Sequence, residues 1–548
     1  MSVPLGCRQL GMEHALQNGQ IQGGFVGMDW AVLGGYFAIL ALTGLWFARR
    51  DQRDAADYFL GGRKMPVWAV AISIVATSLS AATFIGAPEL SFGGNLTYLA
   101  TNIGMVLAAL IIAFYFIPRF YQTQSASIYE FLERRIGIRT RKAASIAFLI
   151  GRVLASGARV FAAAIPLSMV IFGIERGLEP SALIMSIGAL SIVAIAYTLW
   201  GGISSVIWSD VLQYIVLIGA AVAAIMLIGQ TINAPMSEVL DTLRNPVDEN
   251  GTVLGSKLTT LDWSFDLTHP FAIPACLIGY TLLGIGSYGT DQDLAQRMLT
   301  CKDSKAGARS VIMGIILGVP TVAIFLTVGL MLWIAYQHPE LTSEPIARAS
   351  DDGNNLRVFL EYILTQVPPG FRGLMMAGLF AAGLSSMNSA INAMGAAFIA
   401  DLYRPLVPNR EEKHYVKLGR LSVIVAGVVL GAFACVCIYW KDANGYTLID
   451  FALSVMGFAY AGLVGVFFTA IFTKRGNDLS AIAALVVGFL WMLGSQPFLL
   501  AALTDPDQPE SFLDTYASIH HTWKLTLGVL ISTGVCMLGK SHTNLQHD

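Results

Sequence analysis

Hydroxyl side chains interrupt residues 67–87, a stretch that is otherwise long and apolar enough to cross a membrane. The segment VWAVAISIVATSLSAATFIGA has no formal charge, and its hydroxyls belong to Ser73, Thr77, Ser78, Ser80 and Thr83. An unpaired polar group in hydrocarbon is costly, so these oxygens need partners. Hard cations prefer oxygen ligands. The segment therefore predicts a broken helix that binds a dehydrated cation with a polar solute beside it.

A second group of polar residues lies in residues 371–400, an apolar segment rich in Ala and Gly. Ser385, Asn388, Ser389 and Asn392 follow the spacing i, i+3, i+4, i+7, so they share one helix face, and Ser386 lies beside them. Hydroxyls on this face, together with backbone carbonyls of an unwound helix, would suit a sodium ion. The alternative is that small and hydroxyl residues simply pack helices together in the membrane.

Asp210 follows the pair Gly201-Gly202, which predicts a tight hairpin between two spans. The carboxylate would then lie a few residues inside the second span. A charge at the centre of a bilayer costs ~2.5–3.5 kcal/mol on insertion scales, so Asp210 should have a function or a partner. The alternative is an interfacial carboxylate that water satisfies.

Two arginines fall within one apolar segment, residues 143–172. At ~1.5 Å per residue, Arg152 lies near the midplane, and Arg159 lies two turns farther out on the same face. A guanidinium is suited to bidentate capture of a carboxylate, so Arg152 is the stronger candidate for solute binding. The alternative is a structural ion pair with Asp210 or Asp450.

The composition indicates a polytopic membrane protein. Of 548 residues, 55% are hydrophobic and 13% are charged, whereas a soluble chain has about 25% charged residues. The net charge of −2 does not favour nucleic acid as a partner. The six cysteines form no CxxC pair, and all eight histidines fall in predicted loops and tails, which argues against a buried metal, a haem or a histidine proton relay. The spans hold no nucleophile–base pair, so an enzyme is disfavoured, and no cleaved signal peptide is expected.

Thirteen apolar segments predict an all-α protein with about 13 transmembrane helices, at residues 29–48, 67–87, 96–118, 143–172, 180–199, 205–230, 270–290, 308–337, 371–400, 418–440, 447–472, 479–502 and 523–539. Most Lys and Arg residues fall in alternate loops, which predicts an external N-terminus and a cytosolic C-terminus. The long external loops 231–269 and 338–370 are either lids over a vestibule or plain connectors.

Two blocks of five spans suggest an inverted repeat, because an odd number of spans reverses the orientation of the second block. The first span of each block is irregular, and in 270–290 it contains Pro274 and several glycines. The predicted organisation is an external N-terminal segment, a first additional helix with a cytosolic loop, a first repeat, an external loop, a second repeat, and two additional helices with a cytosolic tail: residues 1–28, 29–66, 67–230, 231–269, 270–472 and 473–548.

Several spaced motifs resemble the sodium:solute symporter family over about residues 29–475. They are Asp57-Tyr58-Phe59-Leu60-Gly61-Gly62-Arg63, Thr83-Phe84-Ile85-Gly86, Gly201-Gly202 through Trp208-Ser209-Asp210, Gln292 to Gln296-Arg297, and Ser385-Ser386. The resemblance implies a LeuT-type fold of two inverted five-helix repeats plus extra helices, and sodium-driven alternating access.

The resemblance also implies sodium ligands. The main site would use backbone carbonyls of Ala76, Leu79 and Ala382 and the hydroxyls of Ser385 and Ser386. Some members bind a second sodium, which here would involve Asp210, Ser385, Asn388 and Ser389. Asn388 stands where those members have a hydroxyl residue, and this departure weakens the case for a second site.

For the solute, the resemblance favours a carboxylate. The sugar carriers have an asparagine where this chain reads Thr290-Asp291-Gln292, which argues against a plain sugar site. Positions that match the sialic acid carriers are Ser78, Ser80, Thr83 and Gly151-Arg152, whereas a glutamine of those carriers aligns with Thr101. The expected solute-binding residues are therefore Ser78, Ser80, Thr83, Thr101, Arg152 and Asp291.

The sequence thus predicts a multi-pass protein of the plasma (inner) membrane that takes up a small organic solute with Na+, without an organic cofactor. The solute is expected to be a monocarboxylate or a sialic-acid-like molecule. Alternatives are sodium-coupled uptake of an uncharged sugar or polyol, and a non-transporting solute sensor on the same fold. The expected partners are the solute, sodium ions and membrane lipid. The sequence gives no oligomeric state.

Overall fold

The computed structural model describes residues 25–48, 59–123, 127–174, 176–247, 254–346, 348, 355–444, 447–501 and 512–540. Within these residues the chain is helical, and extended pairing is limited to two isolated bridges, Ile232 with Thr342 and Asp262 with Ala272. Three sequence expectations fall partly outside the described residues: the N-terminal segment before residue 25, Asp57 and Tyr58 of the first motif, and the tail after residue 540.

The first half of the chain forms α2 (Gly27–Ala48), α4 (Val67–Ser78), α5 (Ala81–Gly93), α6 (Thr101–Ile111), α7 (Ile117–Thr123), α8 (Tyr129–Arg135), α9 (Ile138–Phe172), α10 (Pro180–Thr231) and α11 (Met236–Arg244). Short 3-10 or π segments lie between some of them: η1 (Gly61–Arg63), η2 (Thr97–Ala100), η3 (Ile112–Phe116) and η4 (Arg176–Leu178).

The second half forms α12 (Thr281–Ile285), α13 (Gln292–Leu299), α14 (Ser304–Gln337), α15 (Val358–Thr365), α16 (Phe371–Ala397), α17 (Arg404–Leu406), α18 (Glu412–Asn444), α19 (Leu448–Phe472), α20 (Asp478–Gly494), α21 (Pro497–Ala501), α22 (Phe512–Ser518) and α23 (His521–Met537). Its irregular segments are η5 (Ala275–Tyr280), η6 (Gly286–Thr290), η7 (Pro339–Leu341), η8 (Asn355–Arg357) and η9 (Phe398–Tyr403).

Each apolar segment expected to span the membrane contains helix in the described part of the chain. Eight helices there are long and apolar enough to cross a membrane, or nine if α4 and α5 are counted as one bent span. The expected hairpin between 180–199 and 205–230 corresponds to an interruption of α10 at Gly202, whose φ of 58° lies in the left-handed region that glycine tolerates. Glycine at this position therefore permits the break between the two arms of α10.

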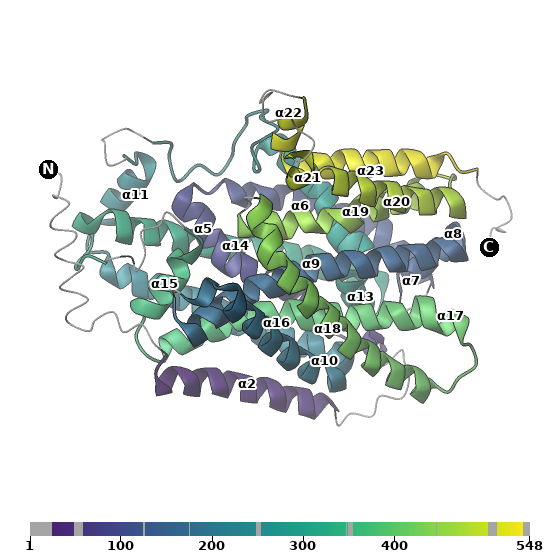
Figure 1. The fold of residues 1–548 in the computed structure, drawn as a ribbon, viewed down its shortest axis with the longest axis horizontal. Coiled ribbons are helices and arrows are strands. Elements are labelled where there is room, and N and C mark those ends of the chain that lie inside the picture. Colours follow the sequence, from purple (N-terminus) through teal and green to yellow (C-terminus); the bar gives the residue numbers. More distant parts are fainter. Residues whose placement is uncertain are drawn as a thin grey trace.

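The long helices run roughly side by side along the long axis of the molecule, as Figure 1 shows. The loop helices α11 and α15, both in segments expected to be external, lie at one end, while α8 and α17 lie at the opposite end (Figure 1). This arrangement separates the loops into the same two groups as the distribution of basic residues.

α16 is the most deeply buried span and packs against both α10 and α9. Small residues permit this close approach: a Cβ added at Gly378 would lie 2.6 Å from the Cβ of Ala220 in α10. A Cβ added at Gly383 would lie 2.6 Å from the Cβ of Ala163 in α9. The Ala- and Gly-rich sequence of α16 therefore lets three helices meet at the depth of its serines.

Candidate functional site

The first helix expected to be irregular is broken in its middle. α4 ends at Ser78 and α5 begins at Ala81, and the two axes differ by 63°. Leu79 and Ser80 between them are extended, with φ/ψ of −82°/117° and −111°/177°. Extended residues interrupt the i to i−4 hydrogen bonds, so carbonyls at the end of α4 are free to accept other donors. The hydroxyl-rich sequence of 67–87 thus predicted the break correctly.

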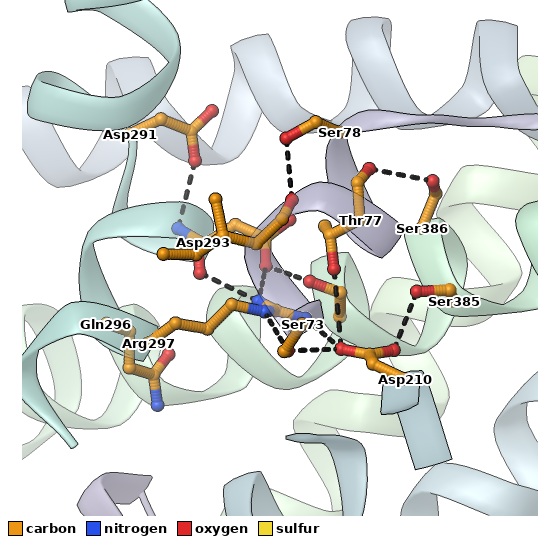
Figure 2. Close-up of polar contacts among 12 residues, drawn as sticks. Ser73, Thr77, Ser78, Asp210, Asp291, Asp293, Gln296, Arg297, Ser385 and Ser386 are labelled. Atoms are coloured by element: carbon orange, nitrogen blue, oxygen red, sulfur yellow. Dashed lines mark hydrogen bonds and ion pairs between the residues drawn. The ribbon is translucent and has the colours of Figure 1, made fainter. Parts of the chain in front are cut away.

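Asp210 of α10 lies beside this break, fully buried, and is surrounded by donors (Figure 2). Its Oδ2 accepts from Ser73 Oγ at 2.5 Å and from Thr77 Oγ1 at 3.4 Å, and its Oδ1 accepts from Ser385 Oγ at 2.6 Å. Arg297 Nη2 lies 3.1 Å from Oδ2. Asp210 is therefore not an interfacial carboxylate but the centre of a buried network that joins α4, α10, α13 and α16.

A second helix break lies opposite the first. The π segment η6 ends at Thr290, Asp291 is extended with φ/ψ of −96°/122°, and α13 follows. The Asp291 carboxylate caps α13 by accepting from the backbone N–H of Asp293 at 2.9 Å. Tyr460 of α19 donates to the other Asp291 oxygen at 2.9 Å. The irregular span expected in 270–290 therefore ends in a capped break that fixes two carboxylates at the centre of the molecule.

Both of these carboxylates form ion pairs with Arg152, whose side chain is 2% exposed. Arg152 forms ion pairs with Asp291, through Nη2 and Oδ2, and with Asp293, through Nη1 and Oδ2 at 3.2 Å. Arg297 bridges the two networks, because its Nη1 lies 2.8 Å from Asp293 Oδ1 (Figure 2). The partners considered from sequence, Asp210 and Asp450, were wrong for Arg152, because the break at Asp291 brings two nearer carboxylates to it.

A pocket of 110 Å³ lies on the other side of the α4–α5 break. Its polar lining comes from that break, from η2 and α6, from η6 and from α9: Ser78, Ser80, Thr83, Tyr98, Thr101, Asn102, Ser287, Tyr288 and Arg159. Four of the six residues expected to bind the solute, namely Ser78, Ser80, Thr83 and Thr101, line this pocket. Arg152 and Asp291 do not line it, and the cation at its wall is Arg159.

Arg159 is held by weak acceptors. Its Nη1 donates to the backbone carbonyl of Thr77 at 3.2 Å, and its Nη2 contacts Met456 Sδ at 3.6 Å. Among the residues that the structure describes, no carboxylate lies within ion-pair distance of this guanidinium. Arg159 is 8% exposed and faces a hydroxyl-lined cavity, so its charge is available to an anionic ligand.

The residues expected to hold sodium lie on two adjacent helices. Ala76 and Leu79 are buried at the end of α4, and Ala382, Ser385 and Ser386 are buried on α16. Ser386 Oγ donates to the carbonyl of Thr77 at 3.1 Å, so α16 faces the break directly (Figure 2). The Ser385 hydroxyl donates to Asp210 instead.

The side chains of the possible second sodium site form hydrogen bonds with different partners instead of converging on one point. Ser389 donates to Asp293, and the side-chain carbonyl of Asn388 accepts from Thr198 at 3.2 Å. Only Asp210 and Ser385 of that set contact each other, and the Arg297 guanidinium lies against the same carboxylate. The Arg297 guanidinium, a permanent cation, therefore lies beside Asp210, the carboxylate that a second sodium would need as a ligand.

Two central residues, Asp293 and Arg297, were missed because the sequence placed Arg297 in a cytosolic loop. Both are at most 1% exposed in α13. Their i, i+4 spacing was an available signal, since an acid and a base four residues apart on a helix can pair. The site therefore contains three aspartates and two arginines in contact, and Arg159 lies apart from them.

Polar contacts cover the end of the site nearest α8. Gln292 Oε1 accepts from the N–H of Ile128 at 3.0 Å, and Tyr129 Oη donates to the carbonyl of Thr290 at 3.0 Å. Ser127 Oγ donates to Asp401 at 2.6 Å, and Arg141 pairs with Asp401 at 2.7 Å. These contacts connect α8 with α13, η9 and the start of α9, on the side opposite the loop helices α11 and α15.

Comparison with known proteins gives consistent matches. Residues 58–488 match the family model described as the sodium:solute symporter family. The sodium/sialic acid symporter SiaT of Proteus mirabilis (strain HI4320) is 32% identical over 86% of this chain and 90% of its own length. The human sodium-coupled monocarboxylate transporter 1 is 27% identical over 91% of this chain and 77% of its own length.

A solved structure, the substrate-bound outward-open state of a Na+-coupled sialic acid symporter, aligns with 95% of this chain and 100% of its own. The TM-score is 0.74 at 27% sequence identity. The LeuT-type helical fold expected from the sequence resemblance is therefore confirmed.

Proposed function

The chain belongs to the sodium:solute symporter family, and from this premise we propose that it imports a hydroxyl-bearing carboxylate, of the sialic acid class, together with Na+. The family and the relatives are transporters rather than enzymes. The protein is an integral, multi-pass membrane protein. We propose that it lies in the plasma (inner) membrane with its N-terminus outside and its C-terminus in the cytosol, because basic residues favour the cytosolic side.

The observation that carries the proposal is the position of Arg159. Its guanidinium lies at the wall of a buried pocket and contacts only a carbonyl and a thioether among the described residues. A carboxylate would replace these weak acceptors with a charge-assisted, bidentate interaction. Arg152, in contrast, already has two carboxylate partners. We therefore assign the solute carboxylate to Arg159 rather than to Arg152.

The remaining pocket residues favour a solute with several hydroxyl groups. Hydroxyls and an amide come from Ser78, Ser80, Thr83, Thr101, Asn102, Ser287 and Tyr288, and Tyr288 donates to Ser78 at 2.9 Å. Thr101 and Asn102 already donate to the carbonyls of Tyr98 and Leu99, so the hydroxyls of Ser80, Thr83 and Ser287 are the groups that a solute with several hydroxyls would bind. The solute for which the Proteus mirabilis relative is named, sialic acid, is a carboxylate with many hydroxyls. An uncharged sugar would leave the charge of Arg159 unpaired.

We propose that sodium binds between the break of α4 and the facing turn of α16. Its ligands would be the carbonyl oxygens of Ala76, Leu79 and Ala382 and the hydroxyls of Ser385 and Ser386. What supports this is the contact of Ser386 with the carbonyl of Thr77, which brings the two helices within reach of one ion. Oxygen donors from an unwound helix are the ligands that a hard cation requires.

We propose that one sodium is transported per solute, and the position of Arg297 supports this. A second sodium beside Asp210 would be repelled by this guanidinium, and two like charges ~4 Å apart at an effective dielectric constant of about 20 repel by about 4 kcal/mol. We therefore propose that Arg297 takes the place of a second cation, and that the set Asp210, Ser385, Asn388 and Ser389 does not bind sodium.

Coupling would arise at the break between α4 and α5. Sodium would hold α16 against the end of α4, and the solute would bind residues on both sides of the same two-residue break. Alternating access would then expose this region first to one side of the membrane and then to the other, through movement of the two five-helix blocks 67–230 and 270–472 against each other. The helices outside these blocks would be additions to the repeats.

The test is uptake of radiolabelled N-acetylneuraminate into proteoliposomes that contain the purified protein. An inward Na+ gradient should drive accumulation, and an equal K+ gradient should not. Unlabelled lactate and glucose in excess should compete weakly or not at all. Uptake that ignores the Na+ gradient would overturn the symport mechanism. Sodium-dependent binding without counterflow would instead indicate a sensor, and strong competition by lactate would indicate a monocarboxylate carrier.

A further inference from the structure

Three potential metal ligands meet at the outer end of α19, apart from the ion-pair network around Asp210 and Arg152. Asp450 lies in the first turn of α19, His520 caps the N-terminus of α23, and His521 is the first residue of that helix. One ligand atom from each lies within 4.8 Å of the other two. The sequence had placed all histidines in loops and tails, which argued against a buried metal. The loop assignment was wrong for His521, because α23 begins at residue 521, earlier than expected, and the side chain is buried.

The atoms that face one another have no hydrogen-bond partner in the described part of the chain. They are Asp450 Oδ1, His520 Nε2 and both ring nitrogens of His521. His521 is 5% exposed, so its imidazole is also shielded from water. A buried polar group without a partner costs about 1–3 kcal/mol. Several such groups at one point therefore indicate a missing ligand.

Asp450 and His520 are each held at the atom opposite the one that faces the cluster. Asp450 Oδ2 accepts from Thr447 Oγ1 at 2.8 Å, and His520 Nδ1 contacts Thr522 Oγ1 at 3.0 Å. Contacts of this kind orient metal-binding side chains and select the ring nitrogen that is free to coordinate. Asp450 Oδ1 and His520 Nε2 are 3.6 Å apart, beyond hydrogen-bond distance, and the two imidazole centroids are 4.0 Å apart.

The donor set identifies the class of metal. Two imidazoles and a carboxylate suit zinc, whereas sodium, magnesium and calcium prefer oxygen alone. Ligand atoms around a tetrahedral zinc lie about 3.3 Å apart, so small side-chain rotations would close the present arrangement. The nearby cation Lys524 is directed away, because its Nζ donates to the carbonyl of Ala517 at 3.0 Å and lies over the Tyr516 ring. Glu89 lies near both Asp450 and Lys441.

We propose that Asp450, His520 and His521 form a zinc site that joins α19 to α23 and restrains transport when it is filled. α19 lines the solute pocket with Ile449, Ala452, Leu453 and Met456, so the metal would sit at the end of a helix that touches the solute. A metal that fixes this end of α19 opposes any movement of α19 relative to α23. The zinc site stands on its own geometry, and the effect on uptake rests on the proposed function.

The site itself is tested by zinc binding to the purified, tag-free protein in detergent, without solute. Titration against a competing fluorescent chelator should show one site that His521→Gln, His520→Gln and Asp450→Asn each weaken at least tenfold. The matched control is His338→Gln, which removes a histidine paired with Glu340 at 2.8 Å and should leave binding unchanged. Because His520 and Asp450 are partly exposed, their variants provide the same test if His521→Gln fails to fold.

Equal zinc affinity in the wild type and in all three variants would overturn the site, as would loss of binding in the control His338→Gln. The effect on transport is tested by external zinc during proteoliposome uptake, which should slow the wild type at least fivefold and leave Asp450→Asn unaffected. Zinc binding without an effect on uptake would overturn the proposed restraint of transport but not the zinc site itself. If no variant or wild type transports the solute, zinc binding in detergent still decides whether the site exists.

Discussion

The guanidinium of Arg159 donates to the backbone carbonyl of Thr77 at 3.2 Å, at the last turn before the break in α4. Ser386 of α16 donates to the same oxygen at 3.1 Å. One carbonyl thus connects the wall of the solute pocket with the helix that carries the proposed sodium ligands. A solute that draws Arg159 away from Thr77 changes the surroundings of the sodium site, which gives the coupling of the two ligands a physical basis.

Arg159→Gln should raise the KM for the solute at least tenfold with a smaller change in sodium activation, because it removes the charge that pairs with the carboxylate. Initial rates of uptake at saturating sodium measure this effect. The matched control is Arg176→Gln, which removes an exposed arginine beyond the end of α9 and should behave as the wild type. An unchanged KM in Arg159→Gln would refute the assignment of this residue.

Ser386→Ala should raise the sodium concentration for half-maximal uptake about tenfold, since it removes a hydroxyl ligand from the break. The KM for solute at saturating sodium should change little. Ser168→Ala is a suitable control, because Ser168 is a buried serine of α9 whose hydroxyl has no partner in the described structure. Equal sodium activation in the two variants would argue against a role for Ser386.

Uptake should be electroneutral, because one sodium ion and one carboxylate carry no net charge. A potassium diffusion potential of 100 mV, inside negative, should leave the accumulation ratio unchanged, whereas one net charge would add about 2.3 kcal/mol of driving force. Sodium activation should show a Hill coefficient near one. A coefficient near two together with voltage-dependent accumulation would show that Arg297 does not replace a second sodium.

Arg152→Gln should mainly destabilise the protein, because it leaves Asp291 and Asp293 buried with less compensation. Removing one partner of a buried ion pair costs about 3–5 kcal/mol. Thermal unfolding in detergent measures this loss. The double variant Arg152→Gln/Asp291→Asn should recover part of it, because one unpaired charge is then gone. If Arg152→Gln keeps full stability and loses only solute affinity, then Arg152 rather than Arg159 binds the solute carboxylate.

Lys257 should make stability depend on pH in the alkaline range. Its ammonium lies under the Trp333 ring and donates to the carbonyls of Phe92 and Gly94 at 2.8 and 3.0 Å. Burial lowers the pKa of Lys257 from 10.5 to about 8. Between these values the unfolded chain binds more protons than the folded one, so the contribution of Lys257 to stability rises with pH.

The measurement is the unfolding temperature of the wild type and of Lys257→Met between pH 7.5 and 10. The unfolding temperature of the wild type minus that of Lys257→Met should increase as the pH increases. A constant difference across this range would contradict the lowered pKa.

The sequence predicted the parts of the site that lie within one helix. Hydroxyls at mid-membrane depth marked 67–87 as an irregular span, and polar spacing placed Ser385 and Ser389 on one face of 371–400, with Ser386 beside them. Such features can be read from one helix because an unpaired hydroxyl in hydrocarbon is unfavourable wherever the helix packs.

Contacts between helices were harder to predict. Arg152 and Arg159 share a helix face, and their roles depend on which carboxylates α13 brings near them. Asp293 and Arg297 resembled loop residues, because the irregular span before them ends in a break rather than at the membrane surface. His521 was likewise assigned to a loop. In each case, the missing information was the position of a neighbouring helix.

The contact between Arg159 and Met456 places an oxidisable sulfur at the wall of the pocket. The sulfur lies 3.6 Å from Nη2 and is a weak acceptor, so a solute carboxylate can displace it. Conversion of Met456 to its sulfoxide would place a strongly polar oxygen against the guanidinium, where it would compete with the solute. Peroxide would transfer one oxygen atom to the Met456 sulfur and leave as water, and the resulting sulfoxide would block the solute site. Bound solute would protect the sulfur, and a sulfoxide reductase could restore transport only when the pocket opens.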